Sequence, residues 1–411
     1  MTEPTPTPLP SFRGARLALF VLTAINVANY VDRYVITAVL PDVQADLGVD
    51  DTRAGLLGTA FMLVYFATSP VFGFFGDRGL RKRWLALGVG LWSLATGLGG
   101  FARHFVTLLA ARATVGVGEA AYGTISPSLI ADYFPKARRG GVMAIFFLAI
   151  PVGSALGYLL GGLLGQHFGW RSAFFVVGFP GLLLALAALF LREPVRGAHD
   201  EPDLAPPPKV LQAYLELAKN PLYVWTVLGY AAYTFAIGGL SFWVPSYMMR
   251  VRDYDQGQGM LLFGSITVVT GIVGTLLGGF IGDRLLKVTP NAYSLVGVVA
   301  VAIGAVATFA ALLVDSSTGF LVLLGVAELF LFLNTGPINA LIVNSVRPAV
   351  RATAMAVSIF TIHILGDAIS PTLIGNISDR TNLQTGMLAI PAVFLLASIL
   401  WAPTLRAPRP A

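Results

Sequence analysis

Long hydrophobic segments follow one another along the whole chain, separated by short polar breaks. An α-helix needs about 20 mostly apolar residues to cross the hydrocarbon core of a bilayer, and segments of this length recur from end to end. They predict twelve membrane-spanning helices, at residues 16–40, 54–75, 84–102, 105–132, 140–166, 172–191, 222–249, 259–282, 292–314, 318–344, 352–377 and 385–404. The predicted fold class is an all-α integral membrane protein.

The longest polar interval lies near the middle of the chain and separates the sixth predicted helix from the seventh. It reads REPVRGAHDEPDLAPPPKVLQAYLELAKN, and its proline and charge are typical of a linker. A short amphipathic helix is predicted near residues 210–219. We therefore predict an N-terminal six-helix bundle at residues 1–191, a cytoplasmic linker at 192–220 and a C-terminal six-helix bundle at 221–411.

The two predicted bundles repeat each other in sequence. The string GFFGDR ends at residue 78 and GFIGDR ends at residue 284, which is 206 residues later. Glu119 in the fourth segment has a counterpart, Glu328, in the tenth segment, at an offset of 209. Internal duplication is characteristic of secondary transporters, which hold their substrate between the repeats.

Basic residues gather in alternate connections between the predicted helices. With the N-terminus placed in the cytoplasm, the inner connections and termini hold 19 Lys and Arg residues and the outer connections hold 6. The positive-inside rule then places both termini in the cytoplasm, and we predict a multi-pass protein of the inner (plasma) membrane. These short clusters explain the net charge of +6 without nucleic acid as a partner, because they form no aromatic-bearing basic surface.

Composition narrows the chemistry further. The chain is 56% hydrophobic and 12% charged, whereas soluble domains contain about 45–50% apolar and about 25% charged residues. It has no cysteine and four histidines, so thiolate metal sites and cysteine nucleophiles are excluded and a zinc site is not expected. We predict no metal and no cofactor.

Several stretches resemble a known family. GFFGDRGLRK, after the second segment, is similar to the loop motif of the major facilitator superfamily, with glycine one place earlier than in the usual D-R-x-G-R-R order. Within that superfamily the chain resembles the Spinster group of lysolipid and sphingolipid transporters, in NYVDRYVITAVLPDVQADLG, RATVGVGEAAYGTISPSLIADYFP, FFLAIPVGSALGYLLGG and FGWRSAFFVVGFPGLLLALAALFLREPVRG. The resemblance implies two six-helix bundles that rock around a central cavity, by alternating access.

Charged residues inside the predicted spans are the candidates for mechanism, because each is unfavourable in hydrocarbon. In the first span, Asp32 is turned about 100° from Arg33 around the helix, so the two need not pair with each other. In the fourth span, Arg112 and Glu119 lie two turns apart on one face. At a rise of about 1.5 Å per residue, Asp32 and Arg112 lie at similar depth, and Glu119 lies nearer the midplane.

These depths give a hypothesis for coupling and binding. We predict that Asp32 pairs with Arg112 or Arg33, and that Glu119 faces the cavity as an acid whose proton affinity is raised by burial; Asp32 and Glu119 are the predicted proton-coupling residues. Arg33 is then free to bind an anionic headgroup, because a guanidinium binds phosphate bidentately. The predicted substrate-binding residues are Asn29, Tyr30, Arg33, Arg112, Tyr122, Tyr230 and Tyr233. The alternative is a buried network that only orients the two helices.

Charged residues at two helix ends predict a gate. Asp77 with Arg78 and Arg81, and Asp283 with Arg284, lie at the cytoplasmic ends of the second and eighth spans. The family resemblance implies that they form an ion-pair latch that closes the cytoplasmic gate in one state. The alternative, positive-inside charge alone, explains the arginines but not an aspartate at the same place in both halves.

Glycines recur every fourth residue in the fifth span, from residue 153 to 165, and in the eighth span, from residue 274 to 282. Such stripes allow close approach of helices. In the fold that the resemblance implies, these two spans meet between the halves. We therefore expect the stripes to form a sliding contact between the bundles.

Two functions within transport remain open. The first is a proton-coupled secondary transporter, acting as a monomer, that moves a lysolipid-like or sphingoid-phosphate-like amphiphile. The alternative is a proton-coupled symporter of small organic anions, because an N-Y-x-D-R string also occurs in such symporters. Long-chain ligands predict a lateral, apolar-lined opening, and small anions predict a sealed polar pocket.

Functions outside secondary transport find little support in the sequence. The chain has no Walker glycine loop for ATP-driven transport. It also has no nucleophile with a base and no metal cluster at the spacing that an enzyme needs, so we predict that it is not an enzyme. A receptor would need a soluble part to transmit its signal, and none is visible.

Overall fold

The computed structural model describes residues 14–134, 142–143, 145–195, 210–346 and 350–406, and the regular elements among them are helices. The first half contains α1 (Ala15–Ala38), α2 (Leu40–Leu47), α3 (Asp51–Arg78), α4 (Arg81–Gly99), α5 (Phe105–Tyr133), α7 (Ala149–Phe168), α8 (Trp170–Gly178) and α9 (Gly181–Leu189). The predicted amphipathic helix is present as α10 (Val210–Lys219). The second half contains α11 (Pro221–Arg250), α12 (Gln256–Leu285), α13 (Ala292–Leu313), α14 (Ser317–Phe332), α15 (Thr335–Asn344), α16 (Arg351–Ile362), η2 (His363–Asp367), α17 (Ser370–Arg380), α18 (Leu383–Trp401) and η3 (Ala402–Leu405).

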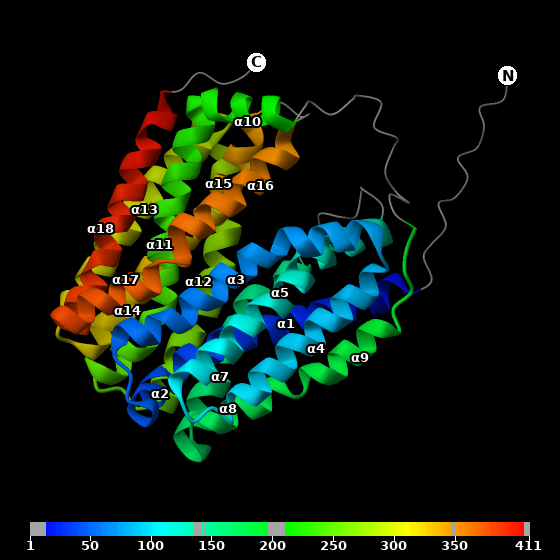
Figure 1. Ribbon diagram of the computed structural model, residues 1–411. Helices are drawn as coiled ribbons and strands as arrows, with labels where there is room; N and C mark the ends of the chain where they lie inside the picture. The colour runs from blue at the N-terminus through cyan, green and yellow to red at the C-terminus, as the bar shows by residue number, and fades with distance from the viewer. Residues whose placement is uncertain (1–13, 135–141, 144, 196–209, 347–349, 407–411) are drawn as a thin grey trace.

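The helices pack into two bundles, and α10 packs against α11 and α16 of the second bundle (Figure 1). In the N-terminal bundle α5 packs against α3 and α4, and α1 packs against α7. In the C-terminal bundle α13 packs against α14 and α18, and α11 packs against α18. Contacts between the bundles come mainly from α7 with α12 and from α3 with α17.

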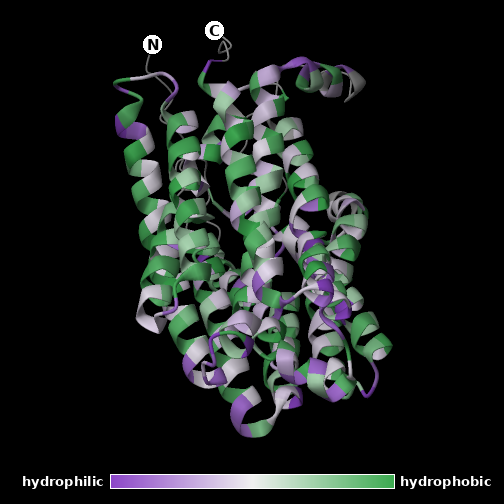
Figure 2. Ribbon diagram, turned by 90° about the vertical axis from the view of Figure 1, so that its left-hand side faces the viewer, coloured by the Kyte–Doolittle hydropathy of each residue, from purple (hydrophilic) through white to green (hydrophobic). Residues whose placement is uncertain are grey.

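Hydrophobic residues predominate along the helices, and hydrophilic residues gather at their ends and connections (Figure 2). Within the described residues, nine helical stretches are long and apolar enough to span a bilayer. The predicted spans formed by α1, α4 and α5 fall outside these nine. Their hydropathy is lowered by charged side chains, since α4 begins with three basic residues and the other two carry Asp32, Arg33, Arg112 and Glu119.

Three of the predicted spans are interrupted rather than continuous. The sixth span divides into α8 and α9 at Pro180, and the tenth divides into α14 and α15 before Pro337. The eleventh contains the π-helical turn η2, where Gly366 leaves helical geometry at φ −106° and ψ −111°. Proline and such π-turns are common causes of kinks in membrane helices, and the π-turn lies beside the cavity described below.

We call the side where α1 begins and η3 ends the terminal face, and the side where α3 and α12 begin the far face. The two bundles meet at the far face and diverge toward the terminal face (Figure 1). Many of the hydrogen bonds between the bundles gather at the far face. There, Asp51 accepts two hydrogen bonds from the Arg250 guanidinium, at 2.5 and 3.1 Å, and one from Ser378 at 2.5 Å.

The C-terminal bundle also caps the start of α3. Asp379, near the end of α17, accepts hydrogen bonds from the backbone N–H groups of Asp51 at 2.9 Å and Thr52 at 2.8 Å. The first N–H groups of a helix lack partners within the helix and carry partial positive charge. An acid from the opposite bundle therefore stabilises this helix start only while the far face is closed.

A related contact holds the start of α12. Gln166 of α7 accepts the backbone N–H of Gly257 at 3.1 Å, while Gln256 donates to the carbonyl of Ala38 at 3.0 Å and to Asp42 at 2.7 Å. α3 and α12 are equivalent helices of the sequence repeat. Each bundle therefore caps one of these two helices in the other bundle. The carboxylate of Asp379 caps α3, and the side-chain amide of Gln166 caps α12.

The glycine stripes do not form the expected sliding contact. A Cβ atom at Gly153 would lie 2.7 Å from the Val27 carbonyl, and one at Gly157 would lie 2.8 Å from the Val31 carbonyl. Both contacts are with α1 of the same bundle. A Cβ at Gly274 would meet the Leu329 carbonyl of α14 at 2.7 Å. Apart from Gly165, where a Cβ would lie 2.8 Å from the Gln256 side chain of α12, the stripes bring helices close within each bundle. Other faces of α7 and α12 meet between the bundles.

Candidate functional site

A cavity of about 460 Å³ lies between the two bundles. Its walls come from α1, α3, α5, α7, α11, α15, α16, η2 and α17, and are mostly apolar and aromatic. Five of the seven predicted substrate-binding residues line it: Tyr30, Arg33, Arg112, Tyr230 and Tyr233. The cavity also receives side chains that the prediction omitted, including Tyr34, Phe61, Met62, Ile359, His363 and Asp367.

Arg33 forms an ion pair with Glu119 rather than remaining free as predicted. Its Nη2 donates to Glu119 Oε2 at 2.7 Å and its Nε donates to the same oxygen at 3.2 Å. The Glu119 side chain is fully buried, whereas 18% of the Arg33 side chain is exposed. Glu119 therefore does not face the cavity as predicted: Arg33 lies at the cavity wall and Glu119 lies behind it. The position of Arg33 on α1 directs its guanidinium toward α5, where Glu119 lies.

Aromatic rings surround the Arg33 guanidinium. Its Cζ lies 5.0 Å from the ring centre of Phe61, 5.2 Å from that of Tyr30 and 5.4 Å from that of Tyr65. Cations are attracted to aromatic faces at such distances. The rings hold the guanidinium at the cavity wall, and Glu119 supplies its counter-charge.

Asp32 lies beside Arg112, as one of the two predicted pairings requires. Arg112 Nη1 is 3.8 Å from Asp32 Oδ1, which is too long for a hydrogen bond. Thr96 Oγ1 lies 2.7 Å from Asp32 Oδ2. The Nε and Nη1 atoms of Arg112 have no hydrogen-bond partner among the described residues. Arg112 therefore keeps unused donors beside the cavity.

The four charges form two crossed pairs whose formal charges cancel. Neighbouring residues of α1, Asp32 and Arg33, each interact with a different residue of α5, as the helical rotation between them requires. Protonation of Glu119 would remove the counter-charge of Arg33. The guanidinium would then be available to an anion in the cavity.

Two predicted substrate-binding residues do not line the cavity. Tyr122 is buried between α1 and α4, where its hydroxyl donates to the Leu22 carbonyl at 2.6 Å and its ring packs at 5.6 Å from that of Trp92. Asn29 is 4% exposed and is not among the described residues that line the cavity. Helical periodicity predicted that both side chains lie near the site. In the structure, the rotation of each helix about its axis directs them into the interior of the N-terminal bundle.

The C-terminal bundle contributes a histidine and an acid that sequence reasoning did not assign to the site. His363 Nδ1 lies 2.9 Å from Asp367 Oδ1, and the His363 ring stacks on Phe66 of α3 at 4.6 Å. The spacing of four residues predicts their contact. The stacking across the bundles depends on the π-turn, which periodicity does not reveal.

In the N-terminal part of the predicted gate, the structure describes the side-chain partners of Arg81. Arg81 donates to Asp132 of its own bundle at 2.5 Å and to Glu193, at the start of the linker, at 2.9 Å. The side chains of Asp77 and Arg78 lie outside the described part of the chain. Arg81 therefore binds two other acids and joins α4 to α5 and to the chain after α9.

The C-terminal part of the predicted gate also has partners in its own bundle. Asp283 accepts a hydrogen bond from the Tyr293 hydroxyl at 2.8 Å. The guanidinium of Arg284 lies 5.8 Å from the ring centre of Phe280. The latch stays a prediction for a conformation in which the terminal face is closed.

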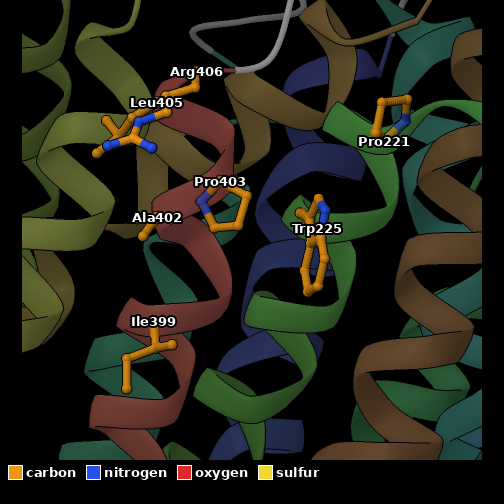
Figure 3. Close-up of a pocket in the computed structure, with 7 residues that line it drawn as sticks. All are labelled: Pro221, Trp225, Ile399, Ala402, Pro403, Leu405 and Arg406. Atoms are coloured by element: carbon orange, nitrogen blue, oxygen red, sulfur yellow. The ribbon is translucent and has the colours of Figure 1, made fainter.

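A second hollow, of about 680 Å³, lies apart from these charges. It is on the C-terminal bundle near the terminal face, between the start of α11 and the end of α18, with Trp225 on one side and Ile399 on the other (Figure 3). Among the described residues that line it, Arg406 is the one with a charge. Because it has no share in the buried charge network, we assign the functional site to the cavity between the bundles.

Two membrane-embedded helical bundles around a shared cavity with buried charges define a multi-pass membrane transporter. The profile of the Major Facilitator Superfamily matches residues 22–371. Human Protein spinster homolog 1 is 38% identical over 389 residues, which cover 89% of this chain and 73% of that protein. Drosophila melanogaster Protein spinster is 36% identical over 377 residues, covering 89% and 62%. The chain belongs to the Spinster group of the major facilitator superfamily.

Solved structures agree with this assignment. A bacterial homolog of the human lysosomal transporter Spinster, in an inward-facing and unoccupied conformation, superposes with a TM-score of 0.86 at 25% identity, covering 97% of this chain and 98% of that one. The comparisons confirm the predicted fold class and the family resemblance. The class is one of transporters rather than enzymes.

Proposed function

We propose that this protein is a proton-coupled secondary transporter of an amphipathic anion with a lysolipid-like or sphingoid-phosphate-like structure. The observation that carries the proposal is the composition of the cavity: a largely apolar and aromatic wall with Arg33 exposed at one point. A guanidinium is suited to a phosphate oxygen pair, and the apolar wall is suited to a hydrocarbon chain. A small organic anion would use the charge but leave the apolar surface without a partner.

Proton coupling follows from competition for Arg33. An ionised Glu119 and an anionic headgroup compete for the same guanidinium, which lies 2.7 Å from Glu119. Protonation of Glu119 removes this competition, so proton and substrate binding favour each other. Such linkage makes the two cross the membrane in the same direction during alternating access.

The orientation is part of the proposal. The excess of basic residues in the predicted inner connections, 19 against 6, supports a cytoplasmic terminal face. The cavity is then inward-facing, in agreement with the solved relative. We place the protein, as a monomer, in the inner (plasma) membrane.

The substrate class is tested by counterflow in proteoliposomes. Vesicles preloaded with lysophosphatidylglycerol, sphingosine phosphate or a small dicarboxylate are assayed for uptake of the labelled compound, with and without a pH gradient. We expect uptake of the two amphiphiles, increased by the gradient. Uptake of the dicarboxylate alone would replace the proposal with the small-anion alternative.

The closed far face gives a prediction about conformation. Asp51→Asn removes the charge that binds Arg250, so the far-face-closed state is expected to lose about 1–3 kcal/mol relative to the open state, which is about a 5- to 150-fold shift in population. Distances between spin labels on α3 and α17 measure the shift. Arg380→Gln, an exposed neighbour, is the control and is expected to leave the distances unchanged. Equal distributions in Asp51→Asn and the wild type would contradict the role of this pair.

A further inference from the structure

Glu328 is a buried acid that the proposed mechanism does not use. It lies on α14 with 5% of its surface exposed. Its carboxyl oxygens contact two hydroxyl groups of α12: Thr267 Oγ1 lies 3.1 Å from Oε1, and Thr270 Oγ1 lies 3.0 Å from Oε2. Glu328 is the counterpart of Glu119 in the sequence repeat.

The two equivalent acids differ in their counter-charge. Glu119 binds Arg33 of α1. In the C-terminal bundle the equivalent helix is α11, whose single basic residue is Arg250 at its end, and Arg250 binds Asp51 at the far face. The repeat has therefore kept the acid in both halves and the intramembrane arginine in one.

No other charge compensates Glu328 from the helices packed around it. α13 and α18 contain no acidic or basic residue, and α12 has only Asp283 and Arg284, at its terminal-face end. Across the bundle interface α7 has Tyr158, which interacts electrostatically with Glu328, and His167 near the far face. An ionised carboxylate buried without a cation would be strongly unfavourable, so the surroundings favour the neutral acid.

The hydrogen-bond geometry also fits a neutral acid. Thr270 Oγ1 lies 2.7 Å from the Ile266 carbonyl as well as 3.0 Å from Glu328 Oε2. A hydroxyl has one proton, and the carbonyl can only accept. When Thr270 donates to the Ile266 carbonyl, its oxygen can accept a hydrogen bond from Oε2–H of a protonated Glu328, while Thr267 donates to Oε1. All three side chains are then satisfied, whereas an ionised Glu328 would compete with Ile266 for the Thr270 proton.

The cluster of Glu328, Thr267 and Thr270 lies beside the contact between the bundles. Thr267 is between Gly264 and Gly271 on α12, and Cβ atoms at these glycines would lie 3.1 Å from the Ala155 carbonyl and 3.7 Å from Pro151 of α7. Thr267 and Thr270 are partly exposed. Rocking of the bundles would change this contact, and with it the access of water to the carboxyl group.

We propose that Glu328 is a second proton-binding site, which holds its proton in the conformation described here and exchanges it when α7 moves relative to α12. The step is a simple dissociation: the O–H bond of the Glu328 carboxyl breaks, the proton passes to water through the hydroxyls of α12, and the carboxylate remains. The role of Glu328 in the transport cycle rests on the proposed proton-coupled transport. The protonation state of Glu328 in this conformation does not depend on that proposal.

Infrared spectroscopy of the purified protein, which needs no substrate, tests the site itself. At neutral pH the wild type is expected to show the carbonyl stretch of a buried protonated carboxylic acid. Glu328→Gln is expected to remove this band, and Thr270→Val is expected to shift it because Oε2–H loses its acceptor. The matched control is Glu119→Gln, which removes the equivalent but ion-paired acid and is expected to leave the band in place. An unchanged band in Glu328→Gln would overturn the proposal.

A second measurement tests the role in transport. Glu328→Gln keeps the size and neutrality of the protonated side chain, so we expect it to transport substrate with one fewer proton per substrate than the wild type. An unchanged proton-to-substrate ratio in Glu328→Gln, despite loss of the infrared band, would overturn the exchange step. If the wild type moves substrate with no proton flow, proton coupling fails while the infrared result still decides the protonation of Glu328.

Discussion

Arg33→Ala is expected to lower the affinity for a lysophospholipid anion by about 150-fold or more, because the substitution removes two charge-assisted hydrogen bonds worth about 1.5–3 kcal/mol each. Arg33 is the part-exposed guanidinium of the cavity, held by the rings of Tyr30, Phe61 and Tyr65. Binding of labelled lysophosphatidylglycerol to the purified protein in detergent measures the change.

Loss of Arg33 also leaves Glu119 buried without a counter-charge, so the single variant can lose stability as well as affinity. The double variant Arg33→Ala/Glu119→Gln removes the stranded charge and separates the two effects. We expect the double variant to fold like the wild type, judged by its melting temperature, and still to bind weakly. Wild-type affinity in the double variant would show that Arg33 is not the headgroup ligand.

Glu119→Gln is expected to abolish the pH dependence of substrate binding. In the wild type, protonation of Glu119 breaks its ion pair with Arg33 and frees the guanidinium, so affinity is high at low pH. The affinity falls as rising pH removes this proton, by at most about tenfold per pH unit for one proton. The variant lacks the ionisable group and is expected to bind tightly at every pH.

The ligand for this experiment is lysophosphatidylglycerol, whose phosphodiester keeps one charge over the pH range. Asp46→Asn serves as the control, because Asp46 is an exposed acid paired with Arg171 at 2.8 Å on the far face. It is expected to keep the wild-type pH profile. A pH-dependent affinity that persists in Glu119→Gln would assign the coupling proton to another group, with Asp32 the nearest candidate.

The architecture could be predicted from sequence because it depends on local properties of the chain, namely the length of hydrophobic segments and the repetition of short motifs. Hydrophobic length predicts a span, and a repeated string such as GFFGDR and GFIGDR predicts duplicated halves. Interruptions of spans were not predicted, although Pro180 and Pro337 were visible. A proline favours a break but does not fix its place, which depends on how neighbouring helices satisfy the freed backbone groups.

The partners inside the site were harder to predict. The rotation of about 100° between neighbouring helical residues correctly predicted that Asp32 and Arg33 point in different directions. Their similar depth in the membrane correctly predicted that Asp32 lies near Arg112. Which acid Arg33 would meet depends on the rotation of α5 against α1, a property that spacing within one helix does not contain. The same limit explains why Tyr122 was expected in the cavity but lies between α1 and α4.

Contacts between distant segments were beyond sequence reasoning for the same reason. The cap that Asp379 places on the start of α3 joins residues more than 300 positions apart, and no local pattern marks it. The neutral surroundings of Glu328 are different. The missing arginine in the second half could have been read from the repeat, although the threonine hydroxyls could not.

The central claim is that proton and amphipathic anion cross together, and proton flow during transport tests it most directly. Wild-type protein is reconstituted into vesicles that contain a pH-sensitive dye, and lysophosphatidylglycerol is added outside at equal pH on both sides. The account predicts acidification of the vesicle interior that follows substrate entry and is strongly reduced in Arg33→Ala/Glu119→Gln. Substrate entry without any change of internal pH would contradict it.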